Sequence, residues 1–298
     1  MRRILSIAVL LGLFLFVWWK GQQHKSDKEV VIGVVQIIDH PALDRTYQGL
    51  KDELTKLYQG KSARIQRESA QGNPALALQI AQKFVGQNVD MLVAIGTTAA
   101  QAARQASNGL VPVVFTSITD PVYAKLVESL DKPLSWLSGV SNFVPVDVSL
   151  NAFRNKWPNT KRIGMIYNPG ESNAVSIVEK TRLICGQAGI ELVTSTAAKA
   201  HEVITAAQRL VHQVDAIWVN NDNTVLASFD ALPPLAQNTG CLLWASDTDL
   251  KGYTAAYGAD QYALGCQTAA MVFRHLTGQQ LLGQSPVEGP EKVMWQDG

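Results

Sequence analysis

From Val30 onward, short runs of apolar and β-branched residues alternate with longer segments in which apolar residues recur at helical spacing. Residues 30–37 form a largely apolar run suited to a strand that is buried on both faces. The next segment places apolar residues at steps of four and three, as in one stripe of a helix: Leu43, Tyr47, Leu50, Leu54 and Leu57. The alternation continues along the chain and predicts an α/β fold, with parallel strands covered by helices.

The alternation comes in two blocks, because strand–helix units run to about residue 130 and the pattern restarts with a strand at 162–167. Two helix–strand segments also resemble one another: Ala81–Val85 with Val89–Asp90, and Ala207–Val211 with Val214–Asp215. A chain of 298 residues exceeds the size at which a single core usually stops growing. We therefore predict two doubly wound parallel-sheet lobes.

A helix predicted at 261–276 returns to the first lobe, so we expect a multi-strand hinge. Asp120 and Pro121 are expected to begin a helix close to that hinge. The predicted limits are 29–119 plus 248–280 for the first lobe, 142–247 plus 286–298 for the second lobe, and 120–141 for a crossing near the hinge.

The first residues have the pattern of an export signal. Arg2 and Arg3 precede a predominantly apolar run at 4–19 that stops at Lys20. The run is shorter than the roughly 20 residues that span a bilayer, and no small-residue cleavage pattern follows it, so a cleaved signal and a retained anchor both stay open. We predict a signal or anchor segment and tether at 1–28, which contacts the membrane at least during export, and a periplasmic or otherwise extracytoplasmic protein.

Composition and motifs narrow the class of function. Lys and Arg number 26 against 25 Asp and Glu, which does not favour a nucleic-acid partner. The three cysteines form no CxxC pair and the five histidines form no i, i+4 pair, so we expect no metal site and no cofactor. The chain also carries no GxSxG, GxxxxGK[ST], GxGxxG or HExxH pattern, so we expect no catalytic residues and no enzyme.

Polar residues gather where the predicted strands end and the helices begin. Open parallel sheets bind ligands outside the carboxyl ends of their strands, so these residues are candidate ligand contacts. They are Thr97, Thr98, Ser117, Thr119 and Asp120 in the first lobe, and Asn168, Glu171, Ser172, Asn173, Asn221, Asp222, Asn223 and Asp247 in the second. Several are equally good helix N-caps, so only their convergence argues for a site.

The two groups of candidates suit opposite charges. Residues 96–98 open an alanine-rich helix, whose free N–H groups and positive dipole end suit a carboxylate. Asp222 and Asp247, at neighbouring strand ends, suit an ammonium group. A ligand that carries both charges is an amino acid. Tyr123 and Phe143 are loop aromatics that could contact an apolar part of it.

Four motifs resemble the family of ABC-transporter substrate-binding proteins typified by tryptophan and tyrosine receptors. They are Gly-Thr-Thr-Ala-Ala-Gln at 96–101, Val-Val-Phe-Thr-Ser-Ile-Thr-Asp-Pro-Val at 113–122, Tyr-Asn-Pro-Gly-Glu-Ser-Asn at 167–173 and Asn-Asp-Asn-Thr at 221–224. The resemblance implies a periplasmic-binding-protein fold of type I with three hinge crossings. It also implies that Asn142, near one crossing, joins the ligand contacts.

By this resemblance we expect the solute receptor of an ABC importer that binds a small molecule, with an aromatic amino acid favoured. Its protein partners would be an ABC permease and that permease's ATPase. Two alternatives stay open: a membrane-tethered periplasmic sensor of the same fold, and a periplasmic enzyme that uses Asp222 or Asp247 as a base.

Overall fold

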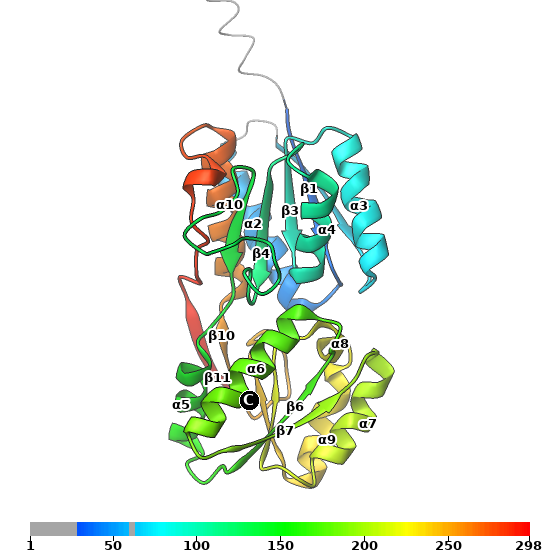
Figure 1. Cartoon of the computed structure of the whole chain (residues 1–298), viewed down its shortest axis with the longest axis vertical. Helices are drawn as coiled ribbons and strands as arrows, with labels where there is room; N and C mark the ends of the chain where they lie inside the picture. Colours follow the sequence, from blue (N-terminus) through cyan, green and yellow to red (C-terminus); the bar gives the residue numbers. More distant parts are fainter. Residues whose placement is uncertain (1–28, 60–62) are drawn as a thin grey trace, which may run out of the picture.

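The computed structural model describes residues 29–59 and 63–298, so the segment predicted as signal or anchor at 1–28 lies outside the described residues. The chain forms two α/β lobes that follow one another along the long axis of the molecule (Figure 1). The sheet of the first lobe has the strand order β2-β1-β3-β4-β5, with all neighbouring strands parallel. These strands are β1 (Val30–Gln36), β2 (Ala63–Ser69), β3 (Met91–Ile95), β4 (Val113–Ile118) and β5 (Leu137–Ser141).

Helices cover both faces of this sheet. The pair α3 and α4 packs together on one side, and the pair α2 and α10 packs together on the other (Figure 1). Their bounds are Pro41–Tyr58 for α2, Pro74–Gly86 for α3, Thr97–Ser107 for α4 and Gln261–Leu276 for α10. The helices α2 and α10 touch closely, because a Cβ at Gly49 would lie 2.1 Å from the carbonyl oxygen of Tyr262. The late helix α10 therefore packs with the first lobe.

The sheet of the second lobe has the order β11-β10-β9-β8-β6-β7, in which only β11 runs antiparallel to its neighbour. The strands are β6 (Arg162–Tyr167), β7 (Glu191–Thr196), β8 (Ala216–Val219), β9 (Leu242–Ala245), β10 (Ala255–Ala259) and β11 (Val293–Asp297). The helices are α5 (Val146–Lys156), α6 (Ser172–Gln187), α7 (Ala200–Leu210), α8 (Asn223–Leu226) and α9 (Leu232–Thr239), with a short 3₁₀ turn at Phe229–Ala231. A second 3₁₀ turn, Leu282–Gln284, packs against β5 of the first lobe. The predicted α/β class with two parallel-sheet lobes is confirmed.

The second lobe buries apolar side chains on both faces of its sheet. On the side of α5 and α6, Trp218 stacks on Trp244 with ring centroids 3.9 Å apart, and Trp244 stacks on Phe153 at 4.5 Å. The other side packs α7, α8 and α9 against the strands. The stacked rings link β8 to β9 close to the carboxyl ends of the two strands, which face the first lobe.

The chain crosses between the lobes three times within the described residues. The crossings run from Ser141 to Val146, from Ala259 to Gln261, and from Glu288, whose segment bridges to Val140, to Val293. Three crossings between parallel-sheet lobes are the arrangement expected of a type I periplasmic binding protein.

Two predicted limits and one predicted helix near the hinge differ from the structure. Residues 248–259 were assigned to the first lobe, but β10 pairs with β9 in the second sheet. The predicted crossing at 120–141 includes β5, which is the edge strand of the first sheet. The helix expected at Asp120 and Pro121 is instead a series of turns. Short strands beside a hinge carry no sequence signal for which of the two sheets they join, so pairing decides the assignment.

Candidate functional site

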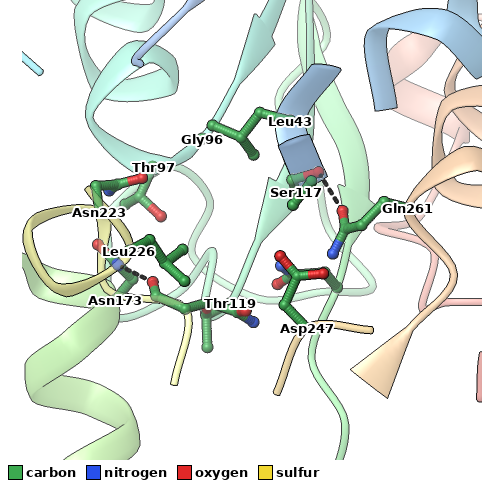
Figure 2. Close-up of a pocket in the computed structure, with 13 residues that line it drawn as sticks. Leu43, Gly96, Thr97, Ser117, Thr119, Asn173, Asn223, Leu226, Asp247 and Gln261 are labelled. Carbon is green, nitrogen blue, oxygen red and sulfur yellow. Dashed lines mark hydrogen bonds between the residues drawn. The ribbon is translucent and has the colours of Figure 1, made fainter. Parts of the chain in front are cut away.

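Two adjoining cavities lie between the lobes at the carboxyl ends of strands from both sheets, beside a third and wider one. The first, which we call the polar cavity, has Gly96, Thr97, Ser117, Gln261, Asn173 and Asp247 in its wall (Figure 2). The second, which we call the aromatic cavity, has Phe143, Ser149, Ile177, Trp218, Asn220 and Ser246 in its wall. Thr119, Asn142 and Asn221 line both, so the two cavities adjoin.

A hydroxyl pair fixes the side-chain amide of Gln261 at one side of the polar cavity. Ser117 lies where the register of β4 shifts, and its φ of 56° turns the chain there. The hydroxyls of Thr46 and Ser117 lie 3.0 and 3.2 Å from Gln261 Oε1. Because the carbonyl oxygen is engaged in this way, the amide nitrogen points into the cavity on the side of Asp247 (Figure 2). The site thus presents a hydrogen-bond donor beside a carboxylate.

Asp247 follows β9 and is 1% exposed. Its Oδ1 accepts a hydrogen bond from the backbone N–H of Asp249 at 2.9 Å, whereas Oδ2 has no hydrogen-bond partner among the described residues. Burial raises the pKa of this carboxyl group to about 7, because a charge in a dry site loses its hydration. A cation in the cavity would restore the ionised form, so Asp247 is suited to an ammonium group.

The helix α4 begins at the opposite side of the same cavity. Gly96 precedes it with a φ of 93°, and a Cβ there would lie 2.6 Å from Ile37 Cγ2, so this turn requires glycine. No side chain caps the helix, and Thr97, its first residue, lines the cavity. The free N–H groups and the positive end of the helix dipole therefore face the cavity, where they suit a carboxylate.

Asp222, the other carboxylate predicted to bind an ammonium group, is placed differently. It is completely buried and does not line either cavity. Its Oδ2 accepts from the N–H of Asn168 at 2.6 Å and its Oδ1 from the N–H of Val225 at 3.0 Å, so it caps α8. Burial, followed by the nearby charge of Glu171, raises the pKa of Asp222 to about 7. Both oxygens are occupied, which makes its role the alignment of the second-lobe loops.

Comparison with known proteins identifies the family of this chain. The sequence profile described as ABC transporter substrate binding protein matches residues 31–289. The chain belongs to this family. A relative named tyrosine-binding protein, from Clostridioides difficile, is 32% identical over 272 residues, which are 90% of this chain and 78% of the relative.

Two solved structures are similar across nearly the whole of this substrate-binding protein. A conserved domain protein from Vibrio cholerae is 39% identical with a TM-score of 0.87, covering 91% of this chain and 92% of that one. A domain from Streptococcus pneumoniae, solved in complex with L-Trp, is 30% identical with a TM-score of 0.84, covering 89% and 91%. Proteins of this family bind solutes outside the cytoplasm. No helix in the described ranges combines the length and apolarity needed to cross a membrane.

The structure of this substrate-binding protein separates the predicted ligand contacts into groups. Eight of them line the polar cavity: Thr97, Ser117, Thr119, Asn142, Asn173, Asn221, Asn223 and Asp247. Three others line the wider cavity between the lobes: Thr98, Asn168 and Glu171. Glu171 accepts hydrogen bonds from the backbone and side chains of Asn223 and Thr224, at 2.6 to 3.0 Å, so it positions the start of α8.

The remaining two, Asp120 and Ser172, contact the other lobe rather than a cavity. Asp120 Oδ2 accepts from Ser176 Oγ at 2.7 Å and forms an ion pair with Lys180, both on α6 of the second lobe. Burial alone would raise the pKa of Asp120, but the hydrogen bond from Lys180 and those from Tyr123 and Ser176 hold it below its ordinary value. Ser172 Oγ lies 3.5 Å from Gln101 Nε2 of the first lobe. These contacts join the lobes in the arrangement that encloses the cavities.

Gln261 and Asn220 are polar lining residues that were not singled out from the sequence. Gln261 was predicted only as the start of a helix, and Asn220 was given no role. Two sequence signals would have indicated these residues. Gln261 is a polar residue directly after a crossing, and Asn220 is a polar residue directly after a buried strand.

Proposed function

We propose that this substrate-binding protein is the extracytoplasmic receptor of an ABC importer for an amino acid with an aromatic side chain. One observation carries the proposal: buried polar atoms without a hydrogen-bond partner among the described residues gather at the two adjoining cavities. They are Asn142 Oδ1, Asn173 Oδ1, Asn220 Nδ2, Asn220 Oδ1 and Asp247 Oδ2. Buried polar groups are nearly always paired, so a cluster of unpaired ones indicates the place of a ligand.

The polar cavity suits the backbone of an amino acid. Asp247 offers a carboxylate to the ammonium group. The uncapped start of α4, on the opposite side, and the amide nitrogen of Gln261, next to Asp247, offer donors to the carboxylate. Opposite charges of the ligand would thus meet opposite charges of the protein, which fixes its orientation.

The aromatic cavity suits the side chain. Phe143, Ile177 and Trp218 give it apolar walls, and the stack of Trp218 on Trp244 makes one wall rigid. A flat ring gains most from such a slot, because it buries a large apolar area at little cost in conformational entropy. The names of the similar tyrosine-binding and tryptophan-bound proteins support the same class of ligand.

The ligand would also drive closure of the lobes. When the lobes separate, water reaches the unpaired groups and satisfies them; when the lobes close without ligand, each stays unpaired at a cost of ~1–3 kcal/mol. A ligand that pairs these groups therefore shifts the population toward the closed form. We expect a membrane permease, energised by a separate ATPase, to recognise that form.

The test is a binding screen with the purified protein. We expect L-tryptophan, L-tyrosine or both to raise the unfolding midpoint, since a ligand that binds only the folded state stabilises it, and the D-enantiomers to have a much smaller effect. Mass spectrometry should recover the ligand unaltered after prolonged incubation. Uptake of the same amino acid by cells should fall when the gene is deleted. The proposal fails if no amino acid shifts the midpoint, or if uptake is unchanged by the deletion.

A further inference from the structure

Asn220 stands out among the residues that line the aromatic cavity. It follows β8 directly and is 2% exposed. Both polar atoms of its side chain, Nδ2 and Oδ1, lack a hydrogen-bond partner among the described residues. A buried amide with neither atom paired costs stability, so its retention at a cavity wall calls for a partner from outside the chain.

Asn142 Oδ1 is the other unpaired buried atom in the wall of the aromatic cavity, and it lies at the border with the polar cavity. The indole Nε1 of Trp218, two residues before Asn220, is already paired, because it donates to Ser246 Oγ at 2.7 Å. Among the described residues, the two amide atoms of Asn220 are thus the unpaired buried side-chain atoms that belong to the aromatic cavity alone.

Trp218 and Phe143 form aromatic walls of the cavity beside Asn220. Trp218 is held from behind by the stack on Trp244 and Phe153. Phe143, on the crossing that follows β5, is positioned by Lys180, whose Nζ lies 4.9 Å from the centroid of the Phe143 ring. A planar group in this cavity would therefore present its edge to Asn220 at a reproducible place.

We infer that Asn220 is a specificity-determining residue whose side-chain amide hydrogen-bonds a polar atom on the ring of the ligand, so that the receptor favours L-tryptophan and L-tyrosine over L-phenylalanine. The inference rests on the proposed function and deepens it. The amide can accept from an indole N–H and can donate to or accept from a phenol hydroxyl. A phenyl ring leaves it unpaired, and a site built to pair a ligand N–H or O–H rejects the analogue that lacks it.

The first arm of the test uses the unaltered protein. Isothermal titration would compare L-tryptophan with 3-(3-benzothienyl)-L-alanine, in which sulfur replaces the indole N–H with little change of shape, and L-tyrosine with L-phenylalanine. We expect the analogue without the polar ring atom to bind about 10- to 100-fold more weakly in the pair that the receptor accepts. Equal affinities within both pairs overturn the inference.

The second arm uses Asn220→Leu and Asn220→Ala. Both should reduce the preference within each pair to about threefold or less, while L-phenylalanine binds Asn220→Leu at least as tightly as it binds the unaltered protein. Asn220→Leu should unfold at the same or a higher temperature without ligand, because it removes two unpaired buried atoms. Equal loss of affinity for all four ligands would assign Asn220 a structural role and overturn the inference.

A matched control is Thr116→Val. The hydroxyl of Thr116 is buried and unpaired among the described residues, but Thr116 lines neither cavity. This variant should keep the preference within each pair, so a change there would show that removal of any buried polar atom alters selectivity. Failure of the proposed function looks different: the unaltered protein would then bind no amino acid at all.

Discussion

Replacement of Asp247 by asparagine separates a binding role from a structural role. Asparagine keeps the acceptor that receives the N–H of Asp249, and it has nearly the same volume. It removes the charge of Oδ2, the atom that has no partner among the described residues. If Asp247 serves the fold, Asp247→Asn should destabilise the protein; if it serves an ammonium ligand, the variant should stay folded and lose the ligand.

The stability change follows from the raised pKa. Because burial raises the pKa of Asp247 from 3.8 to about 7 in the folded protein, its protonation favours the folded state. That contribution is complete below the unfolded value, 3.8, and is lost as pH rises through about 7. The difference between the two pKa values corresponds to ~4 kcal/mol of stability at pH 8. This figure is an upper limit, because the carboxylate can also regain its hydration when the lobes separate without unfolding. Without ligand, Asp247→Asn should therefore match the unaltered protein near pH 4 and be more stable than it at pH 8.

The effect on binding should have the opposite sign. Removal of one partner of a buried charge pair costs ~2–5 kcal/mol, which raises the dissociation constant about 30-fold to several thousand-fold. Isothermal titration with L-tryptophan and thermal melting, both at pH 8, measure the two quantities. Asp222→Asn controls for the loss of a buried charge elsewhere in the second lobe: that carboxyl group is also buried with a pKa of about 7, but it caps α8 and lines neither cavity. Because both of its oxygens accept backbone N–H groups, this variant leaves one N–H unpaired and should melt at a lower temperature. Its affinity should stay within a few-fold of the unaltered protein.

Two results would refute this reasoning. A variant Asp247→Asn that melts well below the unaltered protein at pH 8 would show that the carboxylate stabilises the fold. A variant that keeps its affinity for L-tryptophan would show that no ammonium group meets Asp247. If Asp222→Asn lost the ligand to the same extent, loss of a buried charge anywhere in the second lobe would explain the result.

Three further outcomes are expected. The affinity of the unaltered protein for L-tryptophan should fall about tenfold per pH unit below pH 7, because the ligand requires the ionised form of Asp247. Titrations of Asp247→Asn between pH 5.5 and 7 should show no such dependence on pH. Gln261→Leu should weaken L-tryptophan by about 10- to 100-fold but leave tryptamine, which has no carboxylate, within a few-fold. Asp120→Ala and Lys180→Ala should each weaken the binding of L-tryptophan by about 5- to 10-fold. Their effects should not add in the double variant, because both remove the same contact between the lobes. The ratio of the affinities for L-tryptophan and L-phenylalanine should not change.

The fold was accessible from the sequence because its signals are local. Buried strands of a parallel sheet are apolar throughout, as in β1 and β3, and their helices carry apolar stripes. The hinge was less accessible. The strand β10 consists mainly of alanine and glycine, and a Cβ at Gly258 would lie 1.9 Å from the carbonyl oxygen of Ser246. Gly258 is required by this close approach to the segment that follows β9, which no pattern within 255–259 reveals.

The candidate site was predicted in outline but not in detail. Asp222 and Asp247 are the same residue type at neighbouring strand ends, so sequence patterns cannot separate them. The difference lies in backbone N–H groups from distant loops: Asp222 meets two of them and Asp247 meets one. Asp120 looked like a cap or a ligand contact, and its carboxylate is shared between Tyr123 N–H in its own lobe and Lys180 in the other. Roles of this kind depend on tertiary contacts.

The unpaired groups connect selectivity with closure. Each group that a ligand leaves unpaired, whether Asp247 Oδ2 or the amide of Asn220, weakens binding and also raises the free energy of the closed form. An apparent affinity already includes the fraction of receptors that can close around the ligand. A ligand that pairs the groups of the polar cavity but not Asn220 would therefore bind more weakly. Even when it saturates the receptor, it would hold a smaller fraction of receptors in the closed form that a permease recognises. Discrimination in transport should consequently be at least as sharp as discrimination in binding.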